Sequence, residues 1–408
     1  MTATRAALQD SIHHHDVPPA AVLSALGTVE SLAGIDAEGW ATQLQYIHPM
    51  RTLYVSLAIG VIVLSAVSAS AQVKGGEDET GSYEAVEGWP QPWSKPGYIW
   101  GSQPAVFAQS PDRIFIGVRG ELKAPEPAPR GFNGSWGSTG QRATEPKAEL
   151  RNSIVVVDRA GKLLEAWTQW DRLFEGSGPH KIRISPYDPQ KHVWVVNDGK
   201  HQIHKFTNDG KQLVMTLGEA GVAGDDATHF GMPQDVAFLP DGSILVADGL
   251  RNARIAKFDK DGKFVSSFGT RGSGPGQLSG VHGIAAGKDG RIYVADRSNR
   301  RIQVFDANGT AVDIWPNLRQ PNDIFISDDD TVWVVDGTNA RLLQFDKNGK
   351  RLYFWGTYGM QPGQFWEPHQ ISIDSEGSLY IADSFGGRTQ KYVPSKSGDR
   401  TRLLVPVK

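Results

Sequence analysis

Residues 281–305 read VHGIAAGKDGRIYVADRSNRRIQVF, and this stretch decides the fold. It contains three short runs that are rich in apolar residues and show alternation with a period of two, separated by glycine-rich or polar turns. An Asn308-Gly309 turn and a fourth run follow. Because alternation with a period of two is typical of strands and not of helices, the stretch predicts four short antiparallel strands.

The same pattern returns along the chain. It is read again in 232–248 (MPQDVAFLPDGSILVAD), 320–336 (QPNDIFISDDDTVWVVD) and 367–383 (EPHQISIDSEGSLYIAD). Another copy begins at Pro179, and a degenerate copy begins near Gln103, with strands expected at 105–107, 114–118, 154–157 and 163–167. A four-stranded unit with a period of about 40–50 residues is typical of propeller blades. The sequence therefore predicts an all-β, six-bladed β-propeller of four-stranded antiparallel blades over residues 97–408, with the last blade completed by residues 403–407 or by a strand from 97–101.

Composition excludes some functions. The chain has 408 residues, a net charge of −3 and no cysteine. Its basic residues are scattered, so we expect no nucleic-acid partner. Without cysteine, any metal site must be built from histidine and carboxylate ligands.

The segment from Met50 to Ala71 has the features of a secretory signal peptide. Met50 and Arg51 precede an apolar run from 53 to 67, and Ala-Ser-Ala at 69–71 fits a cleavage site. The alternative is a membrane anchor, but the run of about 15 residues is shorter than the roughly 20 that a spanning helix needs. We expect Met50 to be the true start, residues 1–49 to be an upstream misread or a disordered upstream extension, and 72–96 to be a linker or lead-in. The mature protein is then periplasmic or secreted, without a membrane span.

Three histidines occupy equivalent places in alternate repeats. The residue after the Pro or Val that opens each blade is, in order, Ala105, His180, Gln234, His282, Asn322 and His369. Inner strands of a propeller line its central channel, so His180, His282 and His369 should meet at the axis. Three imidazoles with a fourth position open form a catalytic metal site, so we expect zinc or another divalent ion. The alternative is that the histidines only bind ordered water or each other.

Polar residues near this position are candidates for substrate contact. Gln234 and Asn322 can orient substrate or water. Asp235 and Asp323 can do the same, or serve only as turn formers. Two longer connections, 120–152 and 218–231, interrupt the repeat, and 120–152 is a candidate lid.

These residues resemble a known family. The blades look like NHL repeats, and the pairs Pro179-His180, Val281-His282 and Pro368-His369 resemble the zinc triad of peptidyl-α-hydroxyglycine α-amidating lyase. That enzyme cleaves a C–N bond and releases a peptide amide and glyoxylate. The resemblance covers roughly 102–393 and implies catalytic roles for Arg119 and Arg297, which would hold a carboxylate or developing negative charge. For either arginine, the alternative is an ion pair between blades.

Three positions depart from the family pattern. Leu250 stands where the family has its catalytic tyrosine, and we assign it to substrate contact. Gln370 stands in place of a calcium-binding aspartate, which puts a structural calcium in doubt. Glu367 replaces a methionine two residues before the third histidine, so both side chains should face the same way. We hypothesise that Glu367 is a general base or an additional metal contact; the alternative is a solvated charge at the start of a strand.

The sequence thus predicts a metal-dependent lyase or hydrolase. Its substrate would be a small molecule or peptide that bears a polar hydroxyl or carbonyl group and enters the channel. The alternative is a non-catalytic propeller that binds ligands or proteins on one face, since fold does not dictate function.

Overall fold

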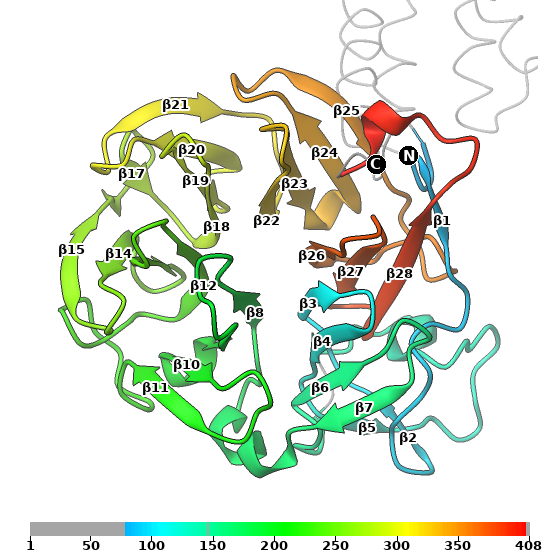
Figure 1. The fold of residues 1–408 in the computed structure, drawn as a ribbon. Helices are drawn as coiled ribbons and strands as arrows, with labels where there is room; N and C mark the ends of the chain where they lie inside the picture. The colour runs from blue at the N-terminus through cyan, green and yellow to red at the C-terminus, as the bar shows by residue number, and fades with distance from the viewer. Residues whose placement is uncertain (1–77, 145–146, 405–408) are drawn as a thin grey trace, which may run out of the picture. The chain divides into compact units, whose positions relative to one another are not determined.

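A computed structural model describes residues 78–144 and 147–404. In these residues, six four-stranded antiparallel sheets surround a central axis (Figure 1). This confirms the predicted six-bladed propeller. The predicted extension at 1–49 and the signal peptide at 50–71 lie outside the described residues. Within the described part, no helix has the length and apolar character needed to cross a membrane.

Each blade runs from an inner strand at the axis to an outer strand. Blades one to three comprise β3 (Ala105–Ser110), β4 (Arg113–Gly117), β6 (Ile154–Val157) and β7 (Leu163–Ala166); β8 (Lys181–Ile184), β9 (Val193–Asn197), β10 (Gln202–Phe206) and β11 (Leu213–Leu217); and β12 (Pro233–Phe238), β13 (Ile244–Asp248), β14 (Arg254–Phe258) and β15 (Phe264–Phe268). Blades four to six comprise β18 (Val281–Ala286), β19 (Ile292–Asp296), β20 (Arg301–Phe305) and β21 (Ala311–Trp315); β22 (Pro321–Ile326), β23 (Val332–Asp336), β24 (Arg341–Phe345) and β25 (Arg351–Trp355); and β26 (Pro368–Ile373), β27 (Leu379–Asp383), β28 (Arg388–Pro394) and β1 (Tyr83–Ala85).

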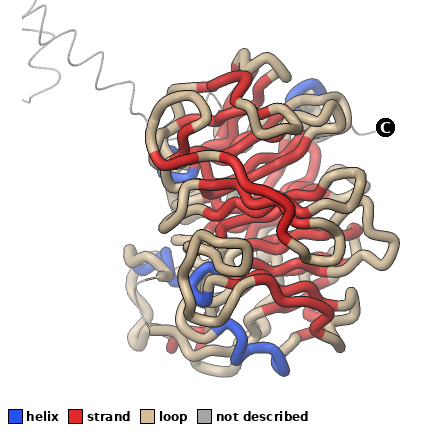
Figure 2. Tube along the Cα trace, turned by 90° about the vertical axis from the view of Figure 1, so that its left-hand side faces the viewer, coloured by secondary structure: helices blue, strands red, loops and turns tan. Residues whose placement is uncertain are grey.

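The remaining elements are short and lie in the connections. Two-stranded sheets are formed by β2 (Tyr98–Trp100) with β5 (Glu121–Lys123) and by β16 (Thr270–Arg271) with β17 (Gln277–Leu278). The 3-10 helices are η4 (Trp136–Thr139), η5 (Thr168–Phe174), η6 (Asp198–Lys200), η7 (Gly337–Asn339) and η8 (Arg400–Arg402). Figure 2 shows the strands as the bulk of the described chain, with these helical turns between them.

Strand β1 closes the ring, which corrects two predictions. Tyr83 pairs with Pro394 and Ala85 with Tyr392, so β1 is the outer strand of the sixth blade. In the described part of the chain, neither 403–404 nor 97–101 fills this place: Leu403 and Leu404 follow η8 into the core without forming a strand, and β2 pairs with β5. The predicted linker at 72–96 therefore contributes a strand to the propeller. A strand of three residues is too short to show an alternating pattern in the sequence. Its register is set by pairing with β28.

The turns between third and fourth strands of blades three to five share one construction. In the turn after β14, the Asp259 carboxylate accepts hydrogen bonds from the backbone N–H groups of Asp261 and Lys263 at 3.0 and 2.9 Å. Gly262 adopts φ +82°, a left-handed conformation that favours glycine. Asp306 and Asp346 make the equivalent bonds after β20 and β24. The Asp-x-Asx-Gly sequence thus supplies the turn chemistry that the repeat requires.

Buried ion pairs position the start of each inner strand in blades three to six. An aspartate ending the second strand bonds to an arginine opening the third, in the pairs Asp248–Arg254, Asp296–Arg301, Asp336–Arg341 and Asp383–Arg388. The same aspartates accept backbone N–H groups from the segment that enters the blade; Asp383 accepts from Glu367 at 2.8 Å. Each buried carboxylate is therefore compensated. The contact fixes the chain two or three residues before the channel-lining position.

The apolar core lies between neighbouring blades. Six clusters of buried side chains each join two adjacent blades, including one between the sixth and first. Burial against both neighbours explains why the second strands read as nearly continuous apolar runs. Ring closure is therefore a packing requirement, since an unpaired blade would expose one such face.

The 120–152 connection begins with β5 and packs onto the sixth blade. The backbone N–H of Gly137 donates to Gly386 O at 3.1 Å, and that of Ala143 donates to Phe385 O at 2.9 Å. The Arg142 guanidinium lies 4.4 Å from the centre of the Phe385 ring. These contacts place the connection beside the end of β27; its role as a lid stays a prediction.

Candidate metal centre

His180, His282 and His369 converge on the propeller axis. His282 and His369 are the second residues of β18 and β26, and His180 directly precedes β8. All three are buried, and the separations of their ring centroids are 4.9, 4.8 and 4.8 Å. One potential ligand nitrogen from each lies within 4.8 Å of the others, and in the described ranges no other group of His, Asp and Glu side chains meets this condition.

The ring separations fit a shared ion. Zinc binds imidazole nitrogen at about 2.0–2.1 Å, so three rings in tetrahedral positions around one zinc would have centroids about 5 Å apart. The observed values of 4.8–4.9 Å match this arrangement. The ligand nitrogens, which lie within 4.8 Å of one another, would have to approach to about 3.3 Å to share one zinc.

Each imidazole is oriented by a backbone carbonyl of the next blade. Nδ1 of His180 lies 2.7 Å from Gln234 O, Nδ1 of His282 lies 2.8 Å from Asn322 O, and Nδ1 of His369 lies 2.7 Å from Pro104 O. A carbonyl only accepts, so Nδ1 carries the proton and donates. Nε2 is thereby left with its lone pair free, which is the tautomer a metal needs.

Burial keeps the triad neutral. It lowers the pKa of His180 to about 3, and it lowers the pKa of His282 and of His369 well below 6.5. Neutral imidazole is the ligand form of histidine. At neutral pH the site therefore presents three lone pairs without prior loss of protons.

Gln234 and Asn322 lie between the histidines, as predicted, and each has an unpaired oxygen. The Gln234 amide N–H donates to Met232 O and Pro233 O, and the Asn322 amide N–H donates to Pro368 O. The side-chain oxygens Oε1 of Gln234 and Oδ1 of Asn322 are buried without a hydrogen-bond partner. Buried acceptors of this kind are normally satisfied by water or ligand, so both fit a site that binds a hydroxyl or water.

The prediction that Ala105 is the first-blade equivalent is wrong by one residue. Ala105 pairs with Gly117, as Asp235 pairs with Ala247, so Pro104 occupies the histidine-equivalent position. The other five inner strands have a bulge or start late at this place, which alignment by eye cannot detect.

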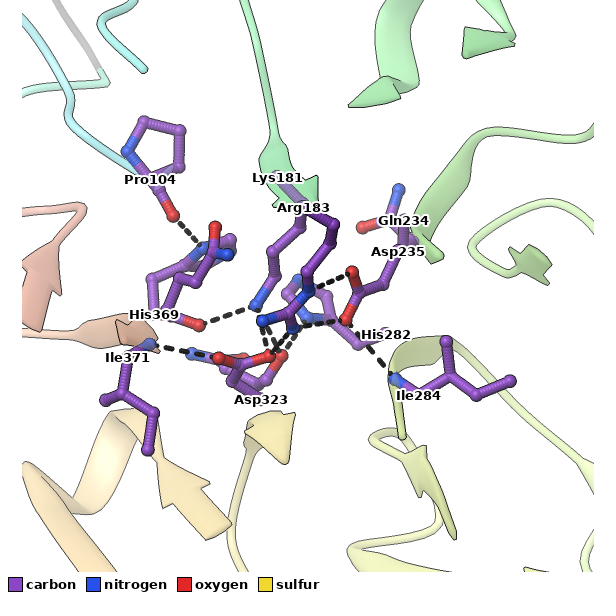
Figure 3. A network of polar contacts seen from close by, with 12 residues as sticks. Pro104, Lys181, Arg183, Gln234, Asp235, His282, Ile284, Asp323, His369 and Ile371 are labelled. Atoms are coloured by element: carbon purple, nitrogen blue, oxygen red, sulfur yellow. Dashed lines mark hydrogen bonds and ion pairs between the residues drawn. The ribbon is translucent and has the colours of Figure 1, made fainter. Parts of the chain in front are cut away.

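A layer of buried charges lies next to the histidines along the axis. Lys181 and Arg183 extend from β8 toward Asp323 of β22, and Arg183 also meets Asp235 of β12 (Figure 3). Burial would raise the pKa of Asp323, but Arg183 and Lys181 together lower it below its usual range. The sequence-based roles of Asp235 and Asp323, substrate orientation or turn formation, are therefore both wrong, because their carboxylates neutralise these two cations.

This layer does not fit a structural calcium. Calcium takes six to eight oxygen ligands. The Gln370 amide, which stands in the position of the family's calcium-binding aspartate, bonds to both the backbone N–H and the carbonyl of Ile182. Nearby oxygens already accept from Lys181, and two positive side chains would repel the ion.

Arg119 is one of two cations at the mouth of the channel. It follows the second strand of the first blade, and its guanidinium lies 3.4 Å from the Asp198 carboxylate, which follows β9 of the second blade. Asp198 also accepts from Ser177 at 3.0 Å and from its neighbour's backbone, Gly199 N, at 2.9 Å. The predicted alternative, an ion pair between blades, is thus present; a role for Arg119 toward substrate stays a prediction.

Arg297 occupies the equivalent place in the fourth blade. Among the described residues, no hydrogen bond or ion pair to its guanidinium is found. Burial lowers its pKa, while Glu367 and Asp198 act in the opposite direction. The positive charge of Arg297 also contributes to the lowered pKa of His282, so the guanidinium lies close to the triad. Arg297 is therefore available to an anionic group at the mouth.

Leu250 is partly buried beside the histidine layer. The preceding Gly249 approaches the third and fourth blades so closely that a Cβ there would lie 1.8 Å from Val281 O and 2.9 Å from Cγ of Gln234. The backbone next to Leu250 thus lies against Val281, the residue before His282, and Leu250 itself carries an apolar side chain in place of a hydroxyl.

Glu367 is buried, so the alternative of a solvated charge is wrong. Its side chain is 3% exposed and accepts a hydrogen bond from the Gln320 amide at 2.8 Å. Burial raises its pKa to about 7, although Arg297 lowers it. It does not join the histidines in the group of potential ligands, which argues against the predicted metal contact. The predicted general-base role stays untested.

Sequence reasoning missed Asp198, Lys181 and Arg183. Asp198 follows Asn197 at the repeat position of Arg119 and Arg297, so aligning the ends of the second strands would have found it. Arg183 is a charged residue at an inner-strand position whose counterparts are mostly apolar, and that contrast is visible in the sequence. Lys181 gives no such contrast, because its counterparts include Asp235, Asp323 and Gln370. The partners of both cations come from other blades.

Comparisons with known proteins agree with this fold. Residues 225–313 match the family described as "6-bladed beta-propeller". The chain is 35% identical over 162 residues to a probable peptidyl-α-hydroxyglycine α-amidating lyase of Caenorhabditis elegans, covering 38% of this chain and 43% of that protein. It is 27% identical over 264 residues to NHL repeat-containing protein 3 of Homo sapiens, covering 60% of this chain and 73% of that protein. The match to the C. elegans lyase thus spans less than half of that protein's length.

A solved structure supports the fold. The structure titled streptogramin B lyase superimposes with a TM-score of 0.50 at 14% identity, covering 76% of this chain and 97% of the other. At this identity the likeness concerns architecture only. Together with the blade repeats and the ring of sheets, these findings establish the chain as a six-bladed β-propeller with homologues named peptidyl-α-hydroxyglycine α-amidating lyase and NHL repeat-containing protein.

Proposed function

We propose that this propeller is a metal-dependent lyase or hydrolase, with zinc as the expected ion. The observation that carries the proposal is the arrangement of His180, His282 and His369, whose Nδ1 atoms are all bonded to backbone carbonyls while one nitrogen of each converges near the axis. Ordered water alone would not need three neutral imidazoles in matching tautomers. When bound, the ion would act as a Lewis acid toward a hydroxyl or carbonyl oxygen.

Residues around the triad would bind and orient the substrate. The unpaired oxygens of Gln234 and Asn322 can accept hydrogen bonds from a substrate hydroxyl or a water. The Arg297 guanidinium can hold a carboxylate or an oxygen on which negative charge develops. Glu367 is the proposed general base, because its carboxylate is buried near Arg297 and the residue directly precedes β26, the strand of His369.

The substrate is expected to carry a hydroxyl or carbonyl group and a negative charge. The amidating relatives suggest a C–N lyase step on a peptidyl α-hydroxyglycine. Leu250 lacks the hydroxyl of the tyrosine that the resemblance places there. We therefore propose that the preferred substrate differs from that of the relatives, and that lactone or ester opening is the second reaction to examine.

Metal analysis of the purified protein tests the proposal. We expect about one zinc per chain, lost in His282→Ala and kept in the control His192→Ala, whose imidazole pairs with Asp188 away from the triad. α-Hydroxyglycine peptides and lactones would then be screened for turnover. A folded wild-type protein that takes up no divalent metal would contradict the proposal and favour a non-catalytic binding platform.

Export is a separate proposal. The residues from Met50 to Ala71 would direct the chain to the periplasm or out of the cell and then be removed. Mass spectrometry of protein from the native host should find an N-terminus at Gln72; a mature protein that starts upstream would contradict export with cleavage.

A further inference from the structure

The Lys181 ammonium lies on the axis among oxygen atoms from two other blades. Its Nζ donates to Asn322 O at 3.1 Å and to His369 O at 2.9 Å, and it lies 3.0 Å from the Asp323 carboxylate (Figure 3). An ammonium has three donors, and these contacts use all of them. Lys181 is fully buried, as is Asp323.

Charge in this layer is balanced. Arg183 bonds to both carboxylate oxygens of Asp235, at 3.0 and 2.7 Å, and to Asp323. The carboxylates also accept backbone N–H groups: Asp323 from Ile371 at 2.9 Å and Asp235 from Ile284 at 3.3 Å. Two cations thus face two carboxylates, and the contacts join blades two to six without any metal ion.

Lys181 is connected to every member of the histidine triad. It directly follows His180 in the chain. It shares an acceptor with His282, since Asn322 O receives both Nδ1 of His282 at 2.8 Å and Nζ of Lys181. It bonds to the backbone carbonyl of His369 itself.

We propose that Lys181 is a positioning residue for the triad and that, with Arg183, Asp235 and Asp323, it takes the place of a structural metal on the propeller axis. The ammonium holds the backbone at Asn322 and at His369, and through it the direction of the imidazoles. Only the identity of what the triad binds depends on the proposed function. The orientation of the rings is a property of the metal-free chain.

The test needs a variant without the ammonium that still folds. Lys181→Met alone leaves Asp323 buried with less compensation, and we expect its unfolding temperature to fall by about 5 °C or more. The double variant Lys181→Met/Asp323→Asn removes one positive and one negative charge and should regain much of this loss. Lys260→Met, on the surface and paired only with Asp261, is the control.

The decisive readout is NMR of histidine-labelled, metal-free protein. In the wild type, the buried Nδ1–H groups of the triad should give downfield signals protected from exchange. The folded double variant should lose or shift the signals of His282 and His369 while the control keeps them. Wild-type signals in the double variant would overturn the proposal, because the rings would then be held without Lys181.

Two further measurements separate this inference from the proposed function. The double variant should bind Co²⁺ at least about tenfold more weakly than the wild type, as expected when a group supporting a ligand is lost. If the wild type binds no Co²⁺, the proposed function fails, and the NMR result still decides the role of Lys181. Millimolar Ca²⁺ should leave the wild-type unfolding temperature unchanged; a rise of several degrees would contradict the replacement of a metal by Lys181.

Discussion

Arg119 and Asp198 form an ion pair of 3.4 Å at the mouth of the channel, each from the same place in neighbouring blades. The pair neutralises one of the two arginines that the family resemblance assigns to catalysis. Arg297, the other one, has no such partner within the described chain. The two arginines should therefore behave differently when replaced.

Arg297→Ala should weaken catalysis on anionic substrates most. A hydrogen bond to a charged group contributes about 1.5–3 kcal/mol, so kcat/KM should fall about 10-fold to 150-fold. A neutral analogue of the same substrate should lose much less. Arg119→Ala should have the smaller effect, and Arg130→Ala, an exposed residue of the 120–152 connection, should have none. Equal losses on charged and neutral substrates would show that Arg297 does not bind the anion.

Metal removal should lower the thermal stability of the protein. An ion that binds only the folded state at 1,000 times its Kd contributes about 4 kcal/mol. Calorimetry should show an unfolding temperature several degrees lower after chelation, restored by zinc. His282→Ala should not respond to zinc, and His192→Ala should respond as the wild type does. A response that survives in His282→Ala would place the stabilising ion elsewhere.

Closure by β1 should be visible in stability. The Tyr83 hydroxyl accepts a hydrogen bond from Leu404 N at 2.9 Å, and its ring lies 6.0 Å from that of Trp355. Tyr83→Phe leaves the buried N–H unpaired and should lower the free energy of unfolding by about 1–3 kcal/mol. Tyr83→Ala also removes the ring and should cost about 3–5 kcal/mol. Urea unfolding measures both; Tyr187→Phe on the surface is the control and should be neutral.

The 218–231 connection should loosen as pH rises. His229 bridges Asp226 and Glu219 through its two ring nitrogens, at 2.8 and 3.3 Å, and these bonds raise its pKa above 6.5. A raised pKa means that the contribution is complete below pH 6.5 and is lost as pH passes the folded-state pKa. Hydrogen exchange of 218–231, corrected for intrinsic rates, should accelerate over that interval. His229→Gln should exchange at one corrected rate throughout; a pH step in that variant would assign the effect to another group.

The sequence by itself determined the blades and the triad. Alternation of period two, Asp-x-Asx-Gly turns and the equivalent places of His180, His282 and His369 are local or repeated properties, so they are readable without coordinates. Six-fold closure then follows from repetition. Metal binding, substrate and export are still predictions from that pattern.

Only the tertiary structure decided which polar residues meet. Tyr83–Ala85 closes the ring because β28 offers it an edge, and a strand this short has no pattern of its own. Asp235 and Asp323 neutralise Lys181 and Arg183 across the axis, and Asp198 neutralises Arg119 across a blade boundary. The reason is physical: a charge's role depends on the charges within a few ångströms of it. On the axis of a propeller those neighbours come from strands 52 to 142 residues away in the chain.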